Sequence, residues 1–100
     1  MTMRKNSILD CLRTHKKELQ EKFTVRRIGI FGSHARGDAH PTSDIDVLVE
    51  LGQPTFDHYM DLKFYLEQLL NKEVDLVIAD TVKPRLRPYI SRDVAYVSGF

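Results

Sequence analysis

Two segments of the chain alternate between apolar and polar residues, the pattern of a strand with one buried face. Residues 44–51 begin their polar face with Asp44 and Asp46, and residues 72–80 carry Asp75 on theirs. A third segment, residues 23–31, is rich in β-branched and aromatic residues and predicts another strand. The apolar faces of the two alternating segments consist of Ile45, Val47, Val49, Leu51, Val74, Leu76 and Ile78.

A broken apolar stripe at helical spacing predicts a helix over residues 6–23, with Asn6 or Ser7 as its N-cap. A second helix is expected over residues 56–71, with Thr55 as its cap. The apolar positions of the two helices are Ile8, Leu12, Leu19 and Phe23 in the first, and Tyr59, Leu62, Leu66, Leu69 and Leu70 in the second.

The rest of the chain is polar or short. Residues 32–43 predict a connection with room for a helical turn. In the tail, Pro84 is expected to open a short helix, followed by an apolar edge strand near residues 94–97. Pro88 then falls inside that helix, where it lacks an amide donor, so the helix boundaries stay open.

Strand, helix and strand in succession predict a right-handed crossover and therefore a parallel pair formed by residues 44–51 and 72–80. The class is α/β (α+β), and 100 residues are enough for one domain with one core. If the apolar sides of both strands pack on one layer of helices, Asp44, Asp46 and Asp75 all emerge on the opposite, open face.

Composition narrows the function classes only a little. Hydrophobic residues make up 42% and charged residues 29%, as in an ordinary globular chain, and the net charge is +1. That charge is unevenly spread: residues 1–36 sum to +6, residues 37–80 to −8 and residues 81–100 to +3. Cys11 is the only cysteine, which fits a reducing cytoplasm. The N-terminal segment is too polar for a signal peptide, and no apolar run reaches the length of a membrane helix.

Three converging carboxylates repel one another unless cations neutralise them. Ligands that are all oxygen suit Mg²⁺ or Mn²⁺, and Asp44 and Asp46 are spaced to share ions from one strand face. Two such ions, about 3.5–4 Å apart, would clamp the attacking and leaving oxygens of a phosphoryl transfer. The acidic residues thus predict a two-metal site.

Residues just upstream of the acidic pair are suited to phosphate. Gly32 permits close backbone approach, and the Ser33 hydroxyl and nearby amides donate hydrogen bonds. Arg36 would add a charge-assisted contact, Gly37 lets the chain turn, and Ser43 would orient Asp44.

Each of these features has an ordinary explanation when taken alone. A glycine-serine pair is usually a turn, an Asp-Ile-Asp segment is usually a surface strand end, and Asp75 fits a solvated edge position. Together, Gly-Ser, Ala-Arg-Gly and Ser-Asp-x-Asp with an apolar continuation over residues 32–46 resemble the signature of the nucleotidyltransferase superfamily that includes DNA polymerase beta. The short length resembles its minimal branch, many of whose members are antitoxins paired with a HEPN ribonuclease toxin.

The resemblance implies a small mixed β-sheet with helices on one face, the palm-like nucleotidyltransferase fold. It implies that Gly32 and Ser33 hold the triphosphate of ATP, with Arg36 and Ser43 in support. Asp44 and Asp46 match the paired ligands of two Mg²⁺ ions, and Asp75 matches the third catalytic carboxylate.

The function implied is transfer of AMP from ATP to a tyrosine hydroxyl of the partner toxin. Two alternatives stay open: a non-catalytic antitoxin that occludes the toxin, and a nucleotide- or RNA-binding subunit of a larger transferase. The basic run at residues 83–88 lacks interleaved aromatics, which argues against direct nucleic-acid binding. The histidines show no zinc-ligand spacing; His34 and His40 flank the site, with phosphate contact and solvent exposure both open.

Overall fold

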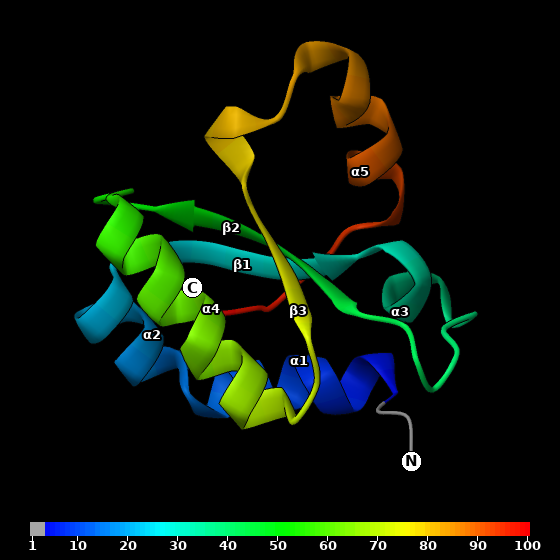
Figure 1. Ribbon diagram of the computed structural model, residues 1–100, viewed down its shortest axis with the longest axis horizontal. Helices are drawn as coiled ribbons and strands as arrows, with labels where there is room; N and C mark the ends of the chain where they lie inside the picture. Colours follow the sequence, from blue (N-terminus) through cyan, green and yellow to red (C-terminus); the bar gives the residue numbers. More distant parts are fainter. Residues whose placement is uncertain (1–3) are drawn as a thin grey trace.

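The computed structural model describes residues 4–100 and is built around a mixed four-stranded sheet (Figure 1). Its strands are β1 (Val25–Phe31), β2 (Ile45–Leu51), β3 (Val74–Ile78) and β4 (Ala95–Tyr96), in the spatial order β3-β2-β1-β4. β2 and β3 are parallel, as the strand-helix-strand order predicts, while β1 is antiparallel to both β2 and β4. The predicted fold class is confirmed.

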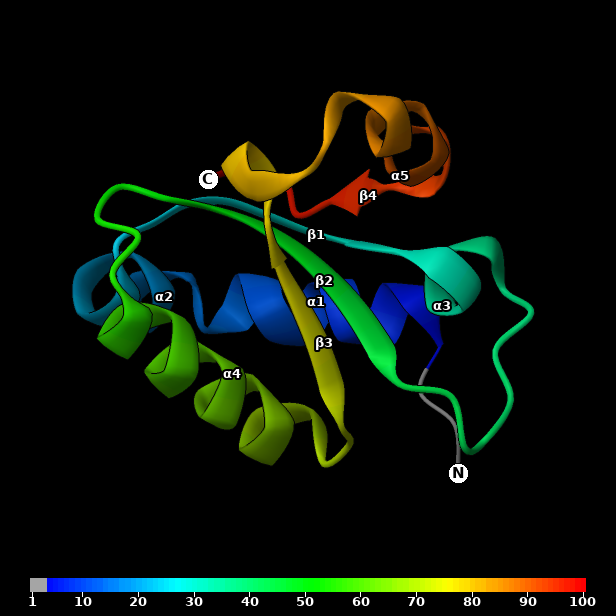
Figure 2. The same ribbon diagram turned by 45° about the horizontal axis from the view of Figure 1, so that its top comes forward.

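Three helices cover one face of the sheet: α1 (Lys5–Thr14), α2 (Lys16–Phe23) and α4 (Phe56–Leu70) (Figure 2). The core lies between these helices and the apolar faces of the strands, and the two alternating segments contribute the side chains predicted for them. Its fully buried members include Ile8, Leu12, Leu19, Ile28, Ile30, Ile45, Val47, Val49, Leu62 and Leu66. The polar faces of β2 and β3 therefore point away from the helix layer.

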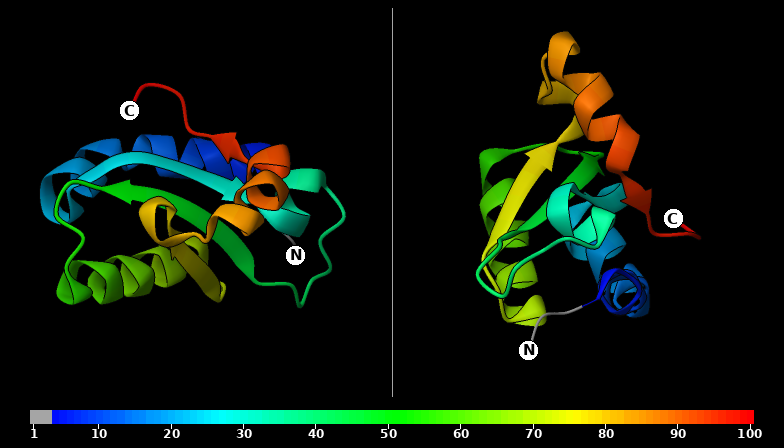
Figure 3. Two further views of the ribbon diagram at one scale, coloured as in Figure 1. Left: turned by 90° about the horizontal axis from the view of Figure 1, so that it is seen from above. Right: turned by 90° about the vertical axis from the view of Figure 1, so that its right-hand side faces the viewer.

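The C-terminal segment lies on the other side of the sheet, at one end (Figures 2 and 3). It contains two 3-10 turns, η1 (Ala79–Thr81) and η2 (Pro84–Leu86), and then α5 (Arg87–Asp93). The expectation that Pro84 opens the helix is wrong: Pro84 begins η2, and α5 starts three residues later with Pro88 in its first turn. The first turn suits proline because its amide has no partner within the helix.

The prediction of one helix over residues 6–23 is wrong in two respects: the chain forms two helices there, and neither predicted residue caps the first of them. The chain bends at His15, whose ring Nδ1 donates to the Cys11 carbonyl over 2.8 Å, and α2 begins after it. Asn6 and Ser7 both lie inside α1, and its N-cap residue Arg4 makes no side-chain capping bond. Each half still buries its own pair of apolar side chains, so the pattern of the core survives the bend.

The other boundaries follow local sequence signals. The Thr55 side chain accepts a hydrogen bond from the His58 amide over 3.1 Å, which confirms it as the cap of α4. The short helical turn expected in the polar connection is α3 (Gly32–Arg36), which follows β1 directly. Within residues 4–100, no helix combines the length and the apolar character needed to cross a membrane.

Candidate active site

The predicted acidic residues meet in one row across the sheet. Asp46 on β2 pairs with Asp75 on β3 and with Phe31 on β1, so these three positions lie side by side on the face away from the helices. Asp44 immediately precedes β2 and is exposed, whereas Asp46 is half-buried. Because side chains alternate between the two faces of a strand, the three carboxylates come together on one face of the sheet, as the sequence predicts.

This proximity changes the proton affinity of the central carboxyl group. The pKa of Asp46 is raised from 3.8 to about 6, most of all by burial and then by the negative charges of Asp75 and Asp44. The positive charge of Arg36 opposes the shift but does not cancel it. Near neutral pH, the positive groups of the protein therefore do not balance the negative charge of the three carboxylates.

We expect the folded protein to lose stability as the pH rises through this range. Asp46 binds a proton more tightly when folded than when unfolded, so its contribution is favourable below its unfolded pKa and is lost as pH passes from about 4 to about 6. Urea denaturation with EDTA, at about pH 4.5 and about pH 7.5, measures this change. The Asp46→Asn variant should lose less stability over this interval, and an equal loss in both proteins would contradict the prediction.

No preformed metal cage exists at this row. Within residues 4–100, no three His, Cys, Asp or Glu side chains are arranged to hold an ion by themselves. A site that shares its ion with a substrate needs no such cage, because Mg²⁺ retains water ligands and commonly completes its coordination with substrate phosphates. The chemistry of the donor set fits such an ion: two carboxylates in register with a third close by, all oxygen ligands and none neutralised by a lysine.

Gly32 lies directly beside the central carboxylate. Its φ of +70° is the left-handed conformation that glycine adopts without cost, and a Cβ there would lie 2.2 Å from Asp46 Oδ2. Gly32 is the first residue of α3, which ends at Arg36 and is capped by Gly37 (φ +86°), whose amide donates to the Ser33 carbonyl over 2.9 Å. The first backbone amides of this short helix thus start next to Asp46, with no side chain in between.

Two predicted site residues are already engaged with protein groups. The Arg36 guanidinium donates to Asp38 Oδ2 over 3.1 Å and to Asp93 Oδ2 over 3.2 Å, tying α3 to the end of α5. Ser43, expected to orient Asp44, accepts a hydrogen bond at its Oγ from the His40 amide over 3.0 Å and so closes the 40–43 turn that leads into Asp44. Both residues shape the connection between β1 and β2.

The two flanking histidines differ in their surroundings. His40 is exposed, but His34 is 2% exposed, and neither of its ring nitrogens has a hydrogen-bond partner of acceptable geometry. Burial lowers the pKa of His34 and the charge of Lys72 adds to this, although the nearby Asp44 backbone has the opposite effect. His34 is therefore a buried, neutral side chain next to the site. The alternative that His34 is exposed to solvent is wrong.

Sequence reasoning missed three residues that shape this region. Asp38 and Asp93 hold Arg36, and nothing in their spacing along the chain points to that arrangement. Gly29 lies inside β1, where a Cβ would come within 2.7 Å of the Ala95 carbonyl oxygen on β4. A lone glycine within a strand is a recognised sign of close backbone approach, so this one was detectable.

Comparison with known proteins identifies the family. A family described as "Nucleotidyltransferase domain" matches residues 12–96. The chain is also 45% identical over 87 residues to the protein adenylyltransferase MntA of Thermococcus cleftensis, covering 86% of this chain and 88% of that protein. The chain is a nucleotidyltransferase of the MntA type. The resemblance carried by residues 32–46 is thereby confirmed.

Solved structures agree on the fold of this nucleotidyltransferase. A toxin–antitoxin complex with AMP-PNP aligns with a TM-score of 0.70 at 24% identity, covering 98% of this chain and 75% of that chain. A complex of tri-AMPylated Shewanella oneidensis HEPN toxin with an MNT antitoxin aligns with a TM-score of 0.65 at 19% identity, covering 92% and 73%. At these identities the likeness establishes the shared nucleotidyltransferase fold.

Proposed function

We propose that this nucleotidyltransferase transfers AMP from ATP, with Mg²⁺, to a tyrosine hydroxyl of a partner HEPN toxin and so inactivates it. The observation that carries the proposal is the in-register pair of Asp46 and Asp75, with Gly32 packed against the first of them. The adenylyltransferase relative and the AMPylated toxin complex support both the transferred group and the acceptor.

The arrangement of Asp46 and Asp75 in one row across the sheet, with Asp44 close by, suggests a division of roles. Asp44 and Asp46 would ligate the metal ions with help from Asp75, and when bound these ions neutralise the triphosphate and stabilise charge on the α-phosphoryl group. Mn²⁺ has the same preference for oxygen ligands. The mutual repulsion of the three carboxylates supports this assignment. A cation there would offset the negative charges of Asp75 and Asp44, which together with burial raise the pKa of Asp46.

The protein's other groups would position the substrate. The Gly32 and Ser33 amides and the Ser33 hydroxyl would hold the β- and γ-phosphates at the start of α3. Arg36 would add positive charge beside them, since it already acts on Asp46 through space, and Ser43 would hold the loop that carries Asp44. Gly32, Ser33 and Arg36 would thus bind and orient ATP, whereas Ser43 would act through the position of Asp44.

The transfer step would then use Asp75 as the base. The acceptor tyrosine oxygen attacks the α-phosphorus while its proton passes to the Asp75 carboxylate. The bond between the α-phosphorus and the bridging oxygen breaks, and pyrophosphate leaves toward Gly32. In-line displacement requires the attacking and leaving oxygens on opposite sides of the phosphorus, as the positions of Asp75 and Gly32 on either side of Asp46 allow.

Intact-mass spectrometry of the cognate toxin tests the proposal. The toxin is incubated with this chain and Mg-ATP, and one or more AMP units should appear on it. The Asp44→Ala variant should produce no mass gain, and EDTA should abolish the gain with the wild-type chain. A stable complex without any mass change would contradict the proposal and favour an antitoxin that acts by occlusion.

The cytoplasmic location predicted from the single cysteine is part of this proposal, because ATP and a ribonuclease toxin meet in that compartment. Direct nucleic-acid binding has no place in it, and RNA association that weakens steeply with salt would instead favour a subunit of a larger transferase.

A further inference from the structure

A cavity of about 230 Å³ lies on the face of the sheet away from the helix layer, and one of its lining residues, Leu48, is two residues beyond Asp46 on β2. Leu48 of β2 lies on one side of it, and η1, α5 and β4 supply the rest. The side chains that matter for its chemistry are Leu48, Asp80, Arg87, Ile90, Ser91 and Tyr96. Leu48 is only 6% exposed although it points away from the main core, so the C-terminal segment is what covers it.

The cavity lies one step along the strands from Asp46. Leu48 follows Asp46 by two residues on the same face, a displacement of about 6.6 Å. It pairs with Gly29 on β1, and Gly29 pairs in turn with Tyr96 on β4. A second row, Tyr96–Gly29–Leu48, thus runs next to the carboxylate row.

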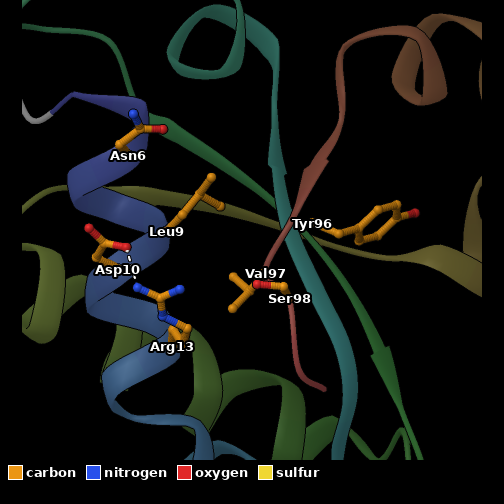
Figure 4. Close-up of a pocket in the computed structure, with 7 residues that line it drawn as sticks. All are labelled: Asn6, Leu9, Asp10, Arg13, Tyr96, Val97 and Ser98. Carbon is orange, nitrogen blue, oxygen red and sulfur yellow. Dashed lines mark hydrogen bonds and ion pairs between the residues drawn. The ribbon is translucent and has the colours of Figure 1, made fainter.

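The absence of a side chain at Gly29 shapes this second row. A Cβ on Gly29 would lie 3.0 Å from Tyr96 Cδ1, so the Tyr96 ring occupies the space over that glycine. Figure 4 shows the ring pointing away from α1, whereas the next residue, Val97, points toward that helix. On the ring, the Arg27 guanidinium lies 3.6 Å from the centroid, and Arg27 is itself 3.9 Å from Glu50. The aromatic wall is therefore held in place by its neighbours.

We infer that this cavity binds the nucleobase of the nucleoside triphosphate, an inference that rests on the proposed function. The leaving pyrophosphate lies toward Gly32 on the β1 side, and the acceptor lies toward Asp75 on the β3 side. The ribose oxygen on the α-phosphorus must point away from that axis. The next cross-strand row on this face is the one that contains Leu48. It lies about one ribose unit from Asp46, and Leu48 lines the cavity.

The size and lining of the cavity suit a single nucleobase. Pockets that enclose whole drug-sized ligands span about 300–1,000 Å³, so 230 Å³ matches a base rather than a complete nucleotide. Leu48 and Ile90 offer apolar contact to the faces of the ring, and Tyr96 offers an aromatic edge or face. Asp80 and Arg87 supply an acceptor and donors for its polar edge.

Two other cavities lie away from the carboxylates. One, of about 270 Å³, separates α1 from the C-terminal tail and is lined by Leu9, Arg13 and Ser98 among others (Figure 4). The other, of about 550 Å³, surrounds Arg26 and Gly52 at the far end of β1. No residue of β2, the strand that carries Asp46, lines either of them, whereas Leu48 of β2 lines the 230 Å³ cavity, so neither is placed to receive the base.

The Ser91→Trp variant tests the inference, because it fills the cavity from an exposed position on α5. Binding of Mg-ATP and of magnesium tripolyphosphate, which has no base, is measured by calorimetry for each protein. We expect the Kd for ATP to rise about tenfold or more, since stacking and burial of one base are lost, while tripolyphosphate binds as before. Ser98→Trp is the matched control, because it places the same side chain at another exposed serine of the tail, beside the α1 cavity.

A second variant keeps the inference testable if Ser91→Trp fails to fold. Tyr96→Leu keeps an apolar residue on β4 but removes the ring, and it should also weaken ATP binding without affecting tripolyphosphate. Unchanged ATP binding in both variants, with a raised KM for the toxin, would overturn the inference and assign the cavity to the acceptor. Equal weakening of ATP and tripolyphosphate would also overturn it. Failure of the wild-type chain to bind either compound would instead contradict the proposed function.

Discussion

Replacing Asp46 by asparagine is expected to lower AMP transfer to the toxin by roughly 10³-fold or more, because under the proposed function Asp46 is the central metal ligand and its loss removes several kcal/mol of transition-state charge stabilisation. Asparagine has nearly the same shape but no negative charge. At neutral pH the variant should be at least as stable as the wild type, since the repulsion from Asp75 and Asp44 is gone. Transfer rates by intact mass and urea denaturation of the same preparation measure both effects.

Glu50→Gln is the matched control for this experiment. Glu50 lies on the same face of β2, four residues beyond Asp46, and its half-buried carboxylate lies 3.9 Å from Arg27. Loss of that pair should cost less than about 1 kcal/mol and leave the transfer rate at saturating ATP intact, because Glu50 contacts neither the carboxylates nor the phosphate-binding turn but only supports Arg27 on the Tyr96 ring. If Asp46→Asn transferred AMP at the wild-type rate, the proposed metal-ligand role of Asp46 would be wrong.

The Gly32→Ala variant is expected to lose both stability and activity. The left-handed backbone costs an alanine about 1–2 kcal/mol, and displacing Asp46 Oδ2 from a Cβ at 2.2 Å adds to this, for roughly 3 kcal/mol or more in total. Because the carboxylate must move, transfer should fall by about 10²-fold or more even in the fraction that folds. Thermal denaturation and transfer assays below the midpoint temperature separate the two losses.

Gly37→Ala isolates the contribution of the clash. Gly37 also has a left-handed backbone, with φ of +86°, but a Cβ there meets nothing within 4 Å. Its substitution should therefore cost only the backbone strain, about 1–2 kcal/mol, and should leave transfer nearly unchanged. Equal losses for the two glycines would show that proximity to Asp46 does not matter.

The carboxylate row was predictable because strand parity is a local property. Once Ile45, Val47 and Val49 are required in the core, Asp44 and Asp46 must face the other way, and the same reasoning places Asp75. The parallel pairing of β2 and β3 followed from the intervening helix. These arguments use only neighbours along the chain and one general rule of connectivity.

The bend at His15 and the start of α5 were not predictable in the same way. A bent and a straight helix present nearly the same apolar stripe over Ile8, Leu12, Leu19 and Phe23, so the pattern does not distinguish them. Pro84 and Pro88 both suit a first helical turn, and only the path of the tail over the sheet decides which of them begins α5.

The sequence by itself determined the two alternating strands, the chemistry of the Gly32–Asp46 motif and the meeting of three carboxylates on one face, because each depends on residue type and short spacing. Only the tertiary structure decided that Arg36 is held by Asp38 and Asp93, that His34 is buried, and that Tyr96 lies over Gly29 beside Leu48. Arg36 and Asp93, and likewise Gly29 and Tyr96, are more than fifty residues apart. Their contacts follow from how the tail packs on the sheet, a balance of many weak interactions that no local pattern encodes.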